Sequence, residues 1–163
     1  QNRDEAVKWY KLAAEQNHKQ AQFNLGTIFL KNKSFNDNYY TAIKWFTKSA
    51  EQGVPEAQYN LGSIYLDGLG VVQNFSKAFS NFLLSAENGF EMSQYKLSLM
   101  FLNGWGTDTD KIKAFMWANI AASRNHEKSI KKRDELLKIL SIKDVERGQE
   151  LSLACFEKKL KNC

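Results

Sequence analysis

Two serines in this sequence are each followed by a lysine three residues later, at Ser93–Lys96 and Ser129–Lys132. On a helix this spacing places the amine one turn from the hydroxyl, which is the arrangement that serine β-lactamases use around their nucleophile. The companion S-D-N and K-T-G sequences of those enzymes are absent. Both matches also fall in predicted helices of the repeat described below, so we interpret them as parts of those helices and not as catalytic pairs.

The other residue types that could carry chemistry are scarce. His18 and His126 are the two histidines of the chain, which excludes a histidine-rich metal site. They occupy one repeat position together with Val54 and Phe90, so a half-packed turn residue explains that position better than a catalytic base. The sequence contains no P-loop, G-x-S-x-G, H-E-x-x-H or dinucleotide-binding pattern. We therefore expect no enzyme activity, no cofactor, no bound metal and no small-molecule substrate.

The two cysteines, Cys155 and Cys163, lie close to the C-terminal end of the sequence. Their spacing is too wide for a C-x-x-C redox or zinc site. They could form one disulfide, which would point to an oxidising compartment, or remain two free thiols. The residues alone leave both alternatives open.

Composition and charge describe an ordinary folded chain. Of its 163 residues, 43% are hydrophobic and 25% are charged, and no apolar run is long enough to span a membrane. The net charge is +5, with Lys and Glu interspersed through most of the sequence, whereas nucleic-acid-binding proteins usually concentrate basic residues on one face. The densest basic run is "KSIKKR" at 128–133, which is either a solvated helix face or a contact for an anionic partner. We expect no nucleic acid as partner.

The sequence repeats itself at a fixed interval. Ala6, Ala42, Ala78 and Ala114 are each 36 residues apart, and the 25-residue windows beginning at the first two share 13 identities. A period of this length is typical of solenoids, in which each repeat is one supersecondary block that stacks on its neighbours. The apolar spacing within each repeat predicts two helices and no strand.

Matching helix start and stop signals recur with the same period. Asn or Gly follows the second helix of each repeat, where a left-handed residue is needed, and Asn or Asp precedes that helix as an N-cap. Gly26 and Gly62 lie in the middle of the first helices, where glycine lowers helix stability relative to alanine. Close packing of a bulky neighbour would offset this loss of stability. We predict that neighbour to be the tryptophan that recurs at one position of the repeat. The left-handed positions are Asn17, Gly53, Gly89 and Asn125, the N-caps Asn38, Asn74 and Asp110, and the tryptophans Trp9, Trp45 and Trp117.

These residues resemble the Sel-1-like repeat, a relative of the tetratricopeptide repeat. The family pattern is roughly A-x-x-x-L-G-x-x-Y-x-x-G-x-G, then K-A and W-Y-x-x-A-A-x-x-G. The stretch "AQYNLGSIYLDGLGVVQNFSKAF" fits it, and several copies agree. The resemblance implies an all-α, right-handed superhelical solenoid of helix–loop–helix repeats. It also implies a non-catalytic scaffold or adaptor that binds a partner protein or peptide on its concave face. The alternative is a cell-wall- or enzyme-associated module with weak penicillin binding.

By analogy with tetratricopeptide arrays, the first helix of each repeat would line the concave face. Asn24 and Asn60 precede two L-G pairs and would hold the backbone of a ligand through paired amide hydrogen bonds. The alternative is that Phe23, Tyr59 and Tyr95 pack between neighbouring repeats. Counted from the L-G pair, the inward positions are Phe23, Thr27, Leu30, Tyr59, Ser63, Leu66, Met92, Tyr95 and Leu99.

The pattern divides the chain into two regions. Residues 1–126 hold about three repeats after a truncated half-repeat, and residues 127–163 form atypical capping helices, as terminal repeats often do. Bacterial members of the family are often exported, and a late cysteine pair fits that habit. We therefore favour a bacterial, periplasmic or secreted location, with the cytoplasm as the alternative.

Overall fold

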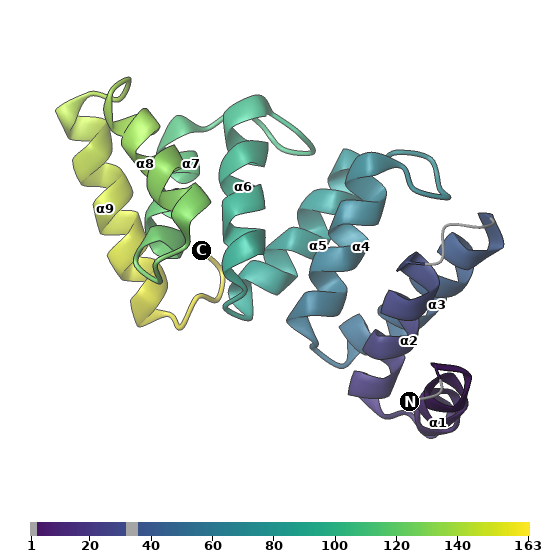
Figure 1. Ribbon diagram of the computed structural model, residues 1–163. Coiled ribbons are helices and arrows are strands. Elements are labelled where there is room, and N and C mark those ends of the chain that lie inside the picture. The colour runs from purple at the N-terminus through teal and green to yellow at the C-terminus, as the bar shows by residue number, and fades with distance from the viewer. Residues whose placement is uncertain (1–2, 32–35) are drawn as a thin grey trace. The chain divides into compact units, whose positions relative to one another are not determined.

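The computed structural model describes residues 3–31 and 36–163, and over these residues it contains nine α-helices and no strand. The all-α helical repeat fold predicted from the sequence is confirmed (Figure 1). None of the described helices is long and apolar enough to cross a membrane. In chain order the helices are α1 (Arg3–Glu15), α2 (Lys19–Lys31), α3 (Asn36–Glu51), α4 (Pro55–Asp67), α5 (Phe75–Glu87), α6 (Glu91–Asn103), α7 (Lys111–Ala122), α8 (Glu127–Leu137) and α9 (Ile142–Glu157).

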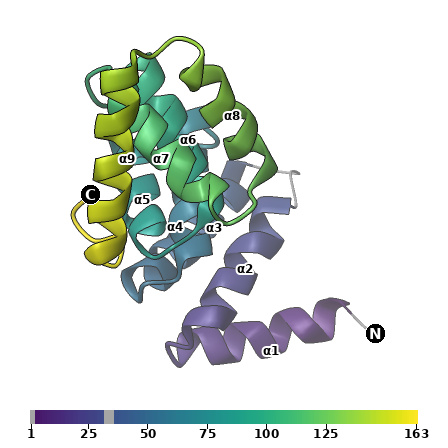
Figure 2. The ribbon, with the colours of Figure 1, turned by 90° about the vertical axis from the view of Figure 1, so that its left-hand side faces the viewer.

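The chain forms two compact units, called unit 1 (Gln1–Asn74) and unit 2 (Phe75–Cys163) below. In unit 1, α2 packs against α1 and α3, and α4 packs against α3. In unit 2, α6 packs against α5 and α7, and α7 also contacts α8 and α9, between which it lies in Figure 2. First helices of the repeat (α2, α4, α6, α8) therefore alternate with second helices (α1, α3, α5, α7). The division of the sequence at 126/127 stays a prediction.

Helix α7 shows how the apolar surface of unit 2 is covered. Eight of its twelve residues are buried, and they lie all around the helix. This burial follows from its three neighbours, α6, α8 and α9, because a helix that is apolar on every side must be enclosed. Capping helix α9 thus covers the side of the last repeat that would otherwise face solvent.

The turns between second and first helices have the predicted left-handed residues. Positive φ angles occur at Asn17 (67°), Gly53 (79°), Gly89 (86°) and Asn125 (62°), so this prediction is confirmed at all four positions. At the Gly53 turn, its own N–H donates to the carbonyl of Ala50 (2.9 Å) and the N–H of Val54 to that of Ser49 (3.3 Å). The equivalent pair of bonds closes the other three turns. This is the Schellman arrangement, which satisfies the last carbonyls of the preceding helix.

A glutamine in each of three first helices fastens the same turns, which the sequence analysis missed. Its side-chain amide donates to an alanine carbonyl in the last turn of the preceding helix. The bonds are Gln22 Nε2 to Ala14 O (3.1 Å), Gln58 Nε2 to Ala50 O (3.1 Å) and Gln94 Nε2 to Ala86 O (3.2 Å). The three glutamines are 36 residues apart and buried. The turn geometry is therefore held by backbone and side chain together.

The N-cap predictions for the second helices hold only in part. Asp110 is confirmed as the N-cap of α7, since its carboxylate accepts from the N–H of Lys113 (2.9 Å). Asn74 directly precedes α5, at the predicted place. Asn38 is wrong as an N-cap because α3 already begins at Asn36.

The bulky neighbour of Gly26 is a phenylalanine and not the predicted tryptophan. A Cβ on Gly26 would lie 2.6–2.9 Å from three ring carbons of Phe46, which is too close for any side chain. Trp45 instead packs with Ala14, Ala21 and Leu25 in a separate cluster. The tryptophan prediction was wrong because adjacent positions of α3 point into different clusters, which the repeat spacing alone does not reveal.

The C-terminal segment folds back onto unit 2. Cys155 and Cys163 form a disulfide, with their Cα atoms 5.2 Å apart. Beyond α9, Leu160 is buried, Lys161 Nζ donates to Asn88 Oδ1 (2.9 Å) and the N–H of Asn162 donates to Glu87 Oε1 (2.8 Å). The disulfide therefore holds a tail that links the end of α9 to the end of α5.

We expect the glutamine bonds to contribute unequally to stability. Gln22 also donates to Asn17 Oδ1 (3.0 Å) and accepts from Gln52 (2.7 Å), whereas the buried Oε1 of Gln94 has no hydrogen-bond partner. Gln22→Leu should lower the free energy of unfolding by about 2 kcal/mol because it breaks a satisfied buried network. Gln94→Leu should be nearly neutral because it also removes an unsatisfied oxygen. Urea denaturation followed by circular dichroism measures both, and equal losses would contradict this account.

We expect the disulfide to stabilise unit 2. Cys163→Ser should lower the free energy of unfolding by about 2 kcal/mol, the loop-closure value for a short loop. Dithiothreitol should lower the urea midpoint of the wild-type protein by a similar amount and leave that of the serine variant unchanged. A wild-type midpoint that does not respond to the reductant would show that the disulfide adds no stability.

Candidate functional site

The residues predicted to bind a partner lie on the first helices α2, α4 and α6. We call their sides the first-helix face of unit 1 (on α2 and α4) and of unit 2 (on α6). The half-buried members are Phe23, Asn24, Thr27, Leu30, Tyr59, Asn60, Ser63, Tyr95 and Leu99. Each of these side chains exposes part of its surface, so each is in place to touch a partner while also contacting its own helix neighbours.

Two positions depart from this half-buried pattern. Leu66 is only 9% exposed, so little of its side chain is open to a partner. Met92 at the start of α6 is 42% exposed and is the most open apolar member of the predicted set. The first turn of α6 therefore exposes an apolar side chain to solvent.

The aromatic members contribute to packing as well as to the face. The ring centroid of Phe23 lies 6.0 Å from that of Phe46, and Phe23 packs against the core of unit 1. Tyr95 lies 5.5 Å from the imidazole of His126, at the beginning of α8. Phe23 and Tyr95 thus take part in packing, and because both are half-buried their place in a partner-binding face stays a prediction.

The polar members of unit 1 differ in whether they have partners. Thr27 Oγ1 donates to the carbonyl of Phe23 (3.1 Å), a bond within its own helix. Asn24 and Asn60, in contrast, make no hydrogen bond to any described residue. They occupy equivalent positions on α2 and α4, which contact each other. Two half-exposed carboxamides thus keep their donors and acceptors available.

Neither serine of the S-x-x-K pairs is accessible. Ser93 is buried and its hydroxyl donates to Ser85 Oγ (2.6 Å). Ser129 is also buried, and its Oγ lies 2.8 Å from Nδ1 of His126. This Ser–His contact caps a helix, because the same Nδ1 accepts from the N–H of Ser129 (3.3 Å) at the start of α8. The alternative of penicillin binding finds no support here.

The repeat position shared by His18, Val54, Phe90 and His126 is the N-cap position of the first helices, a role that the sequence analysis did not assign. Val54, Phe90 and His126 precede α4, α6 and α8, all in extended conformation. Among the described residues, no group of three or more His, Cys, Asp or Glu side chains could hold a metal ion.

A shallow depression in unit 2 was not anticipated from the sequence. It has a volume of about 610 Å³ and lies between the end of α6 and the starts of α7 and α9. Leu102, Ile112, Ile139 and Leu140 supply an apolar lining, while its polar residues are Thr109, Asp110, Lys111 and Asp144. Asp110 and Asp144 are both engaged at helix N-termini, and the depression offers polar and apolar contact in similar measure.

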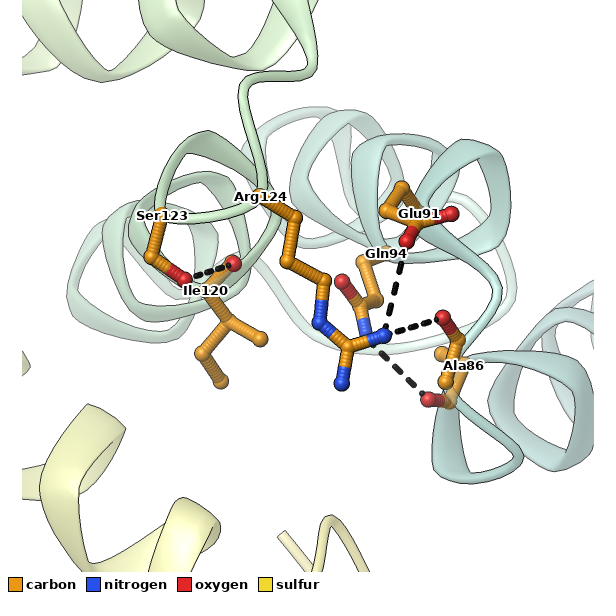
Figure 3. Close-up of polar contacts among 7 residues, drawn as sticks. Ala86, Glu91, Gln94, Ile120, Ser123 and Arg124 are labelled. Atoms are coloured by element: carbon orange, nitrogen blue, oxygen red, sulfur yellow. Dashed lines mark hydrogen bonds and ion pairs between the residues drawn. The ribbon is translucent and has the colours of Figure 1, made fainter.

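Turn residues also link successive repeats along one edge of each unit. In unit 1, Gln52 Nε2 donates to Gln22 Oε1 (2.7 Å) and to Asn17 Oδ1 (3.2 Å). At the equivalent place in unit 2, Arg124 Nη1 donates to the carbonyl of Gly89 (2.7 Å) and approaches Glu91 Oε1 at 3.4 Å (Figure 3). These bonds hold the first helices side by side and so position the faces described above.

The geometry can be compared with known proteins. A family model described as the Sel1 repeat matches residues 1–18, 19–54, 55–90 and 92–126. The protective antigen c5321 of uropathogenic Escherichia coli, whose crystal structure displays an SLR fold, is 31% identical with a TM-score of 0.90. The match covers 98% of this chain and 34% of the antigen, so the chain spans about a third of that protein.

A second solved structure gives the same result. A Sel1 repeat protein from Oxalobacter formigenes is 32% identical with a TM-score of 0.71, over 79% of this chain and 97% of its own length. A search of curated proteins finds no significant match. The matched repeats coincide with the helical hairpins and turns described above, and the chain belongs to the Sel1 repeat family.

Proposed function

We propose that this chain is a non-catalytic scaffold that binds a segment of a partner protein along its first-helix faces. Sel1 repeats are generally protein–protein interaction modules. The observation that carries the proposal is that Asn24 and Asn60, at equivalent points of the contacting helices α2 and α4, have no hydrogen-bond partner among the described residues. Elsewhere in these repeats, polar side chains such as Gln22 are bonded to the protein itself.

The pair is suited to a polypeptide backbone. Each carboxamide offers two N–H donors and an acceptor oxygen, which complement the C=O and N–H groups of one peptide unit. Equivalent amides on neighbouring helices would contact successive parts of an extended segment. Half-exposed apolar side chains beside them, such as Phe23 and Tyr59, would supply the buried contact that stabilises most interfaces.

The disulfide supports a location outside the bacterial cytoplasm. Disulfides such as Cys155–Cys163 persist mainly in oxidising compartments, and the two solved relatives described above are bacterial. We propose the periplasm or the exterior of a bacterial cell as the place where the partner is met.

Loss of the two amides should weaken partner binding without unfolding the protein. We expect the double variant Asn24→Ala/Asn60→Ala to bind its partner roughly thirtyfold more weakly, since two hydrogen bonds of about 1 kcal/mol each are lost. Affinity capture from native bacterial lysate, with quantitative mass spectrometry, identifies the partner. Titration of the purified partner then measures the dissociation constant, and circular dichroism checks the fold of the variant.

The matched control removes two amides from second and capping helices. Asn81→Ala/Gln149→Ala, on α5 and α9, should capture the same partner with wild-type affinity. Equal binding by both double variants and the wild type would place the interaction elsewhere on the molecule. Equal weakening by both would point to a general loss of structure.

A further inference from the structure

The repeat position that holds Asn24 and Asn60 in unit 1 holds a different type of residue in unit 2. Asn24 and Asn60 in unit 1 are followed, at the same interval of 36 residues, by Lys96 and Lys132 in unit 2. A neutral group that both donates and accepts is thus replaced by a cation that only donates. The ligand that suits this position in unit 2 therefore carries negative charge.

Three lysines of α6 and α8 have no partner in the part of the chain that the structure describes. Lys132 pairs with Glu135, and Arg133 Nη2 lies 2.8 Å from Asp134 Oδ1. Lys96, Lys128 and Lys131 make no hydrogen bond or ion pair to any described residue. Their charges are therefore not neutralised within unit 2, although acidic side chains are close by in sequence.

The two helices that carry these lysines are joined at their beginnings. Tyr95, next to Lys96 on α6, contacts the ring of His126, which is the N-cap of α8. Both helices pack against α7, as Figures 1 and 2 show. On α6, the half-exposed or exposed Met92, Tyr95 and Leu99 fall with Lys96 within about 100° of the helix circumference. We call these four residues, together with Lys128 and Lys131, the basic face.

The charge of the chain is concentrated in the same unit. Residues 75–163 contain 15 Lys and Arg against 11 Asp and Glu, a net charge of +4, whereas residues 1–74 contain 8 against 7. Nearly all of the net +5 therefore belongs to unit 2. This asymmetry favours the approach of a negatively charged partner to that unit.

We propose that the basic face binds an extended acidic segment of the partner protein, with an apolar side chain of that segment against Met92 and Leu99. The proposal rests on the scaffold function above and specifies the chemistry of its ligand. Carboxylates would pair with Lys96 and Lys131. A polypeptide fits better than a nucleic acid because the lysines stand beside Met92 and Leu99, whose apolar side chains match an apolar side chain of a peptide and not a phosphate backbone.

The test uses a phage-displayed library of random twelve-residue peptides panned on the intact protein. We expect the enriched peptides to carry a net negative charge with at least one large apolar residue. Their retention should fall at least tenfold on a Lys96→Glu/Lys131→Glu variant, and more modestly on Lys96→Gln/Lys131→Gln, which avoids new repulsion. Binding should also weaken with added salt because the contacts are ionic and partly exposed.

The control variant is Lys143→Glu/Lys158→Glu, which makes the same charge change on and just after α9 and should leave retention unchanged. Neutral or basic enriched peptides, no enrichment, or equal retention on the Lys96/Lys131 variants would each overturn the proposal. Tighter binding of a thirty-nucleotide single-stranded oligonucleotide than of the enriched peptides would overturn it in favour of nucleic acid. If partner capture still depends on Asn24 and Asn60, only the acidic ligand fails and the scaffold function stands.

Discussion

The closed turn between a second helix and the following first helix is the constraint on which the rest of each unit depends. The carbonyl of Ala50 accepts two hydrogen bonds, one from the N–H of Gly53 and one from Gln58 Nε2. The backbone bond requires a left-handed residue. The side-chain bond fixes the direction in which the next helix leaves the turn and the rotation of that helix about its own axis. Once both are made, the apolar side of that helix must face its neighbours, and the opposite side is left more exposed.

Much of this could be predicted because the signals are local. A few adjacent residues set the helical spacing and the left-handed positions, and these signals recur every 36 residues. The structure confirms the left-handed positions at Asn17, Gly53, Gly89 and Asn125. The choice of packing partner was not predictable in the same way. Trp45 and Phe46 are neighbours of similar character, and only the rotation of α3 decides that Phe46 meets Gly26. The glutamine bond was missed because a buried amide looks like a surface residue in sequence.

The residue types at this contact change along the repeats. Gly26 faces Phe46, twenty residues further on. In the third copy the corresponding residues are Ser98 and Ala118, both fully buried, so a larger residue replaces glycine where a smaller one replaces phenylalanine. The exchange leaves the hydroxyl of Ser98 without a hydrogen-bond partner, a cost that glycine avoids. The third copy therefore fills this position with a smaller pair of residues than the Gly26–Phe46 pair of unit 1.

The two polar columns of the first helices illustrate how a repeat can separate stability from recognition. The column of Gln22 is bonded to the preceding helix in α2, α4 and α6, where it stays glutamine, and it becomes Ile130 in α8. The column of Asn24 lies two residues later, is unpaired in α2 and α4, and changes from amide to ammonium in α6 and α8. A side chain that the fold uses is restricted by the geometry of its bond, whereas a side chain that the fold does not use is restricted only by its ligand. In α8 the lysine of this column, Lys132, pairs with Glu135, so the proposed difference in ligand concerns Asn24 and Asn60 on one side and Lys96 on the other.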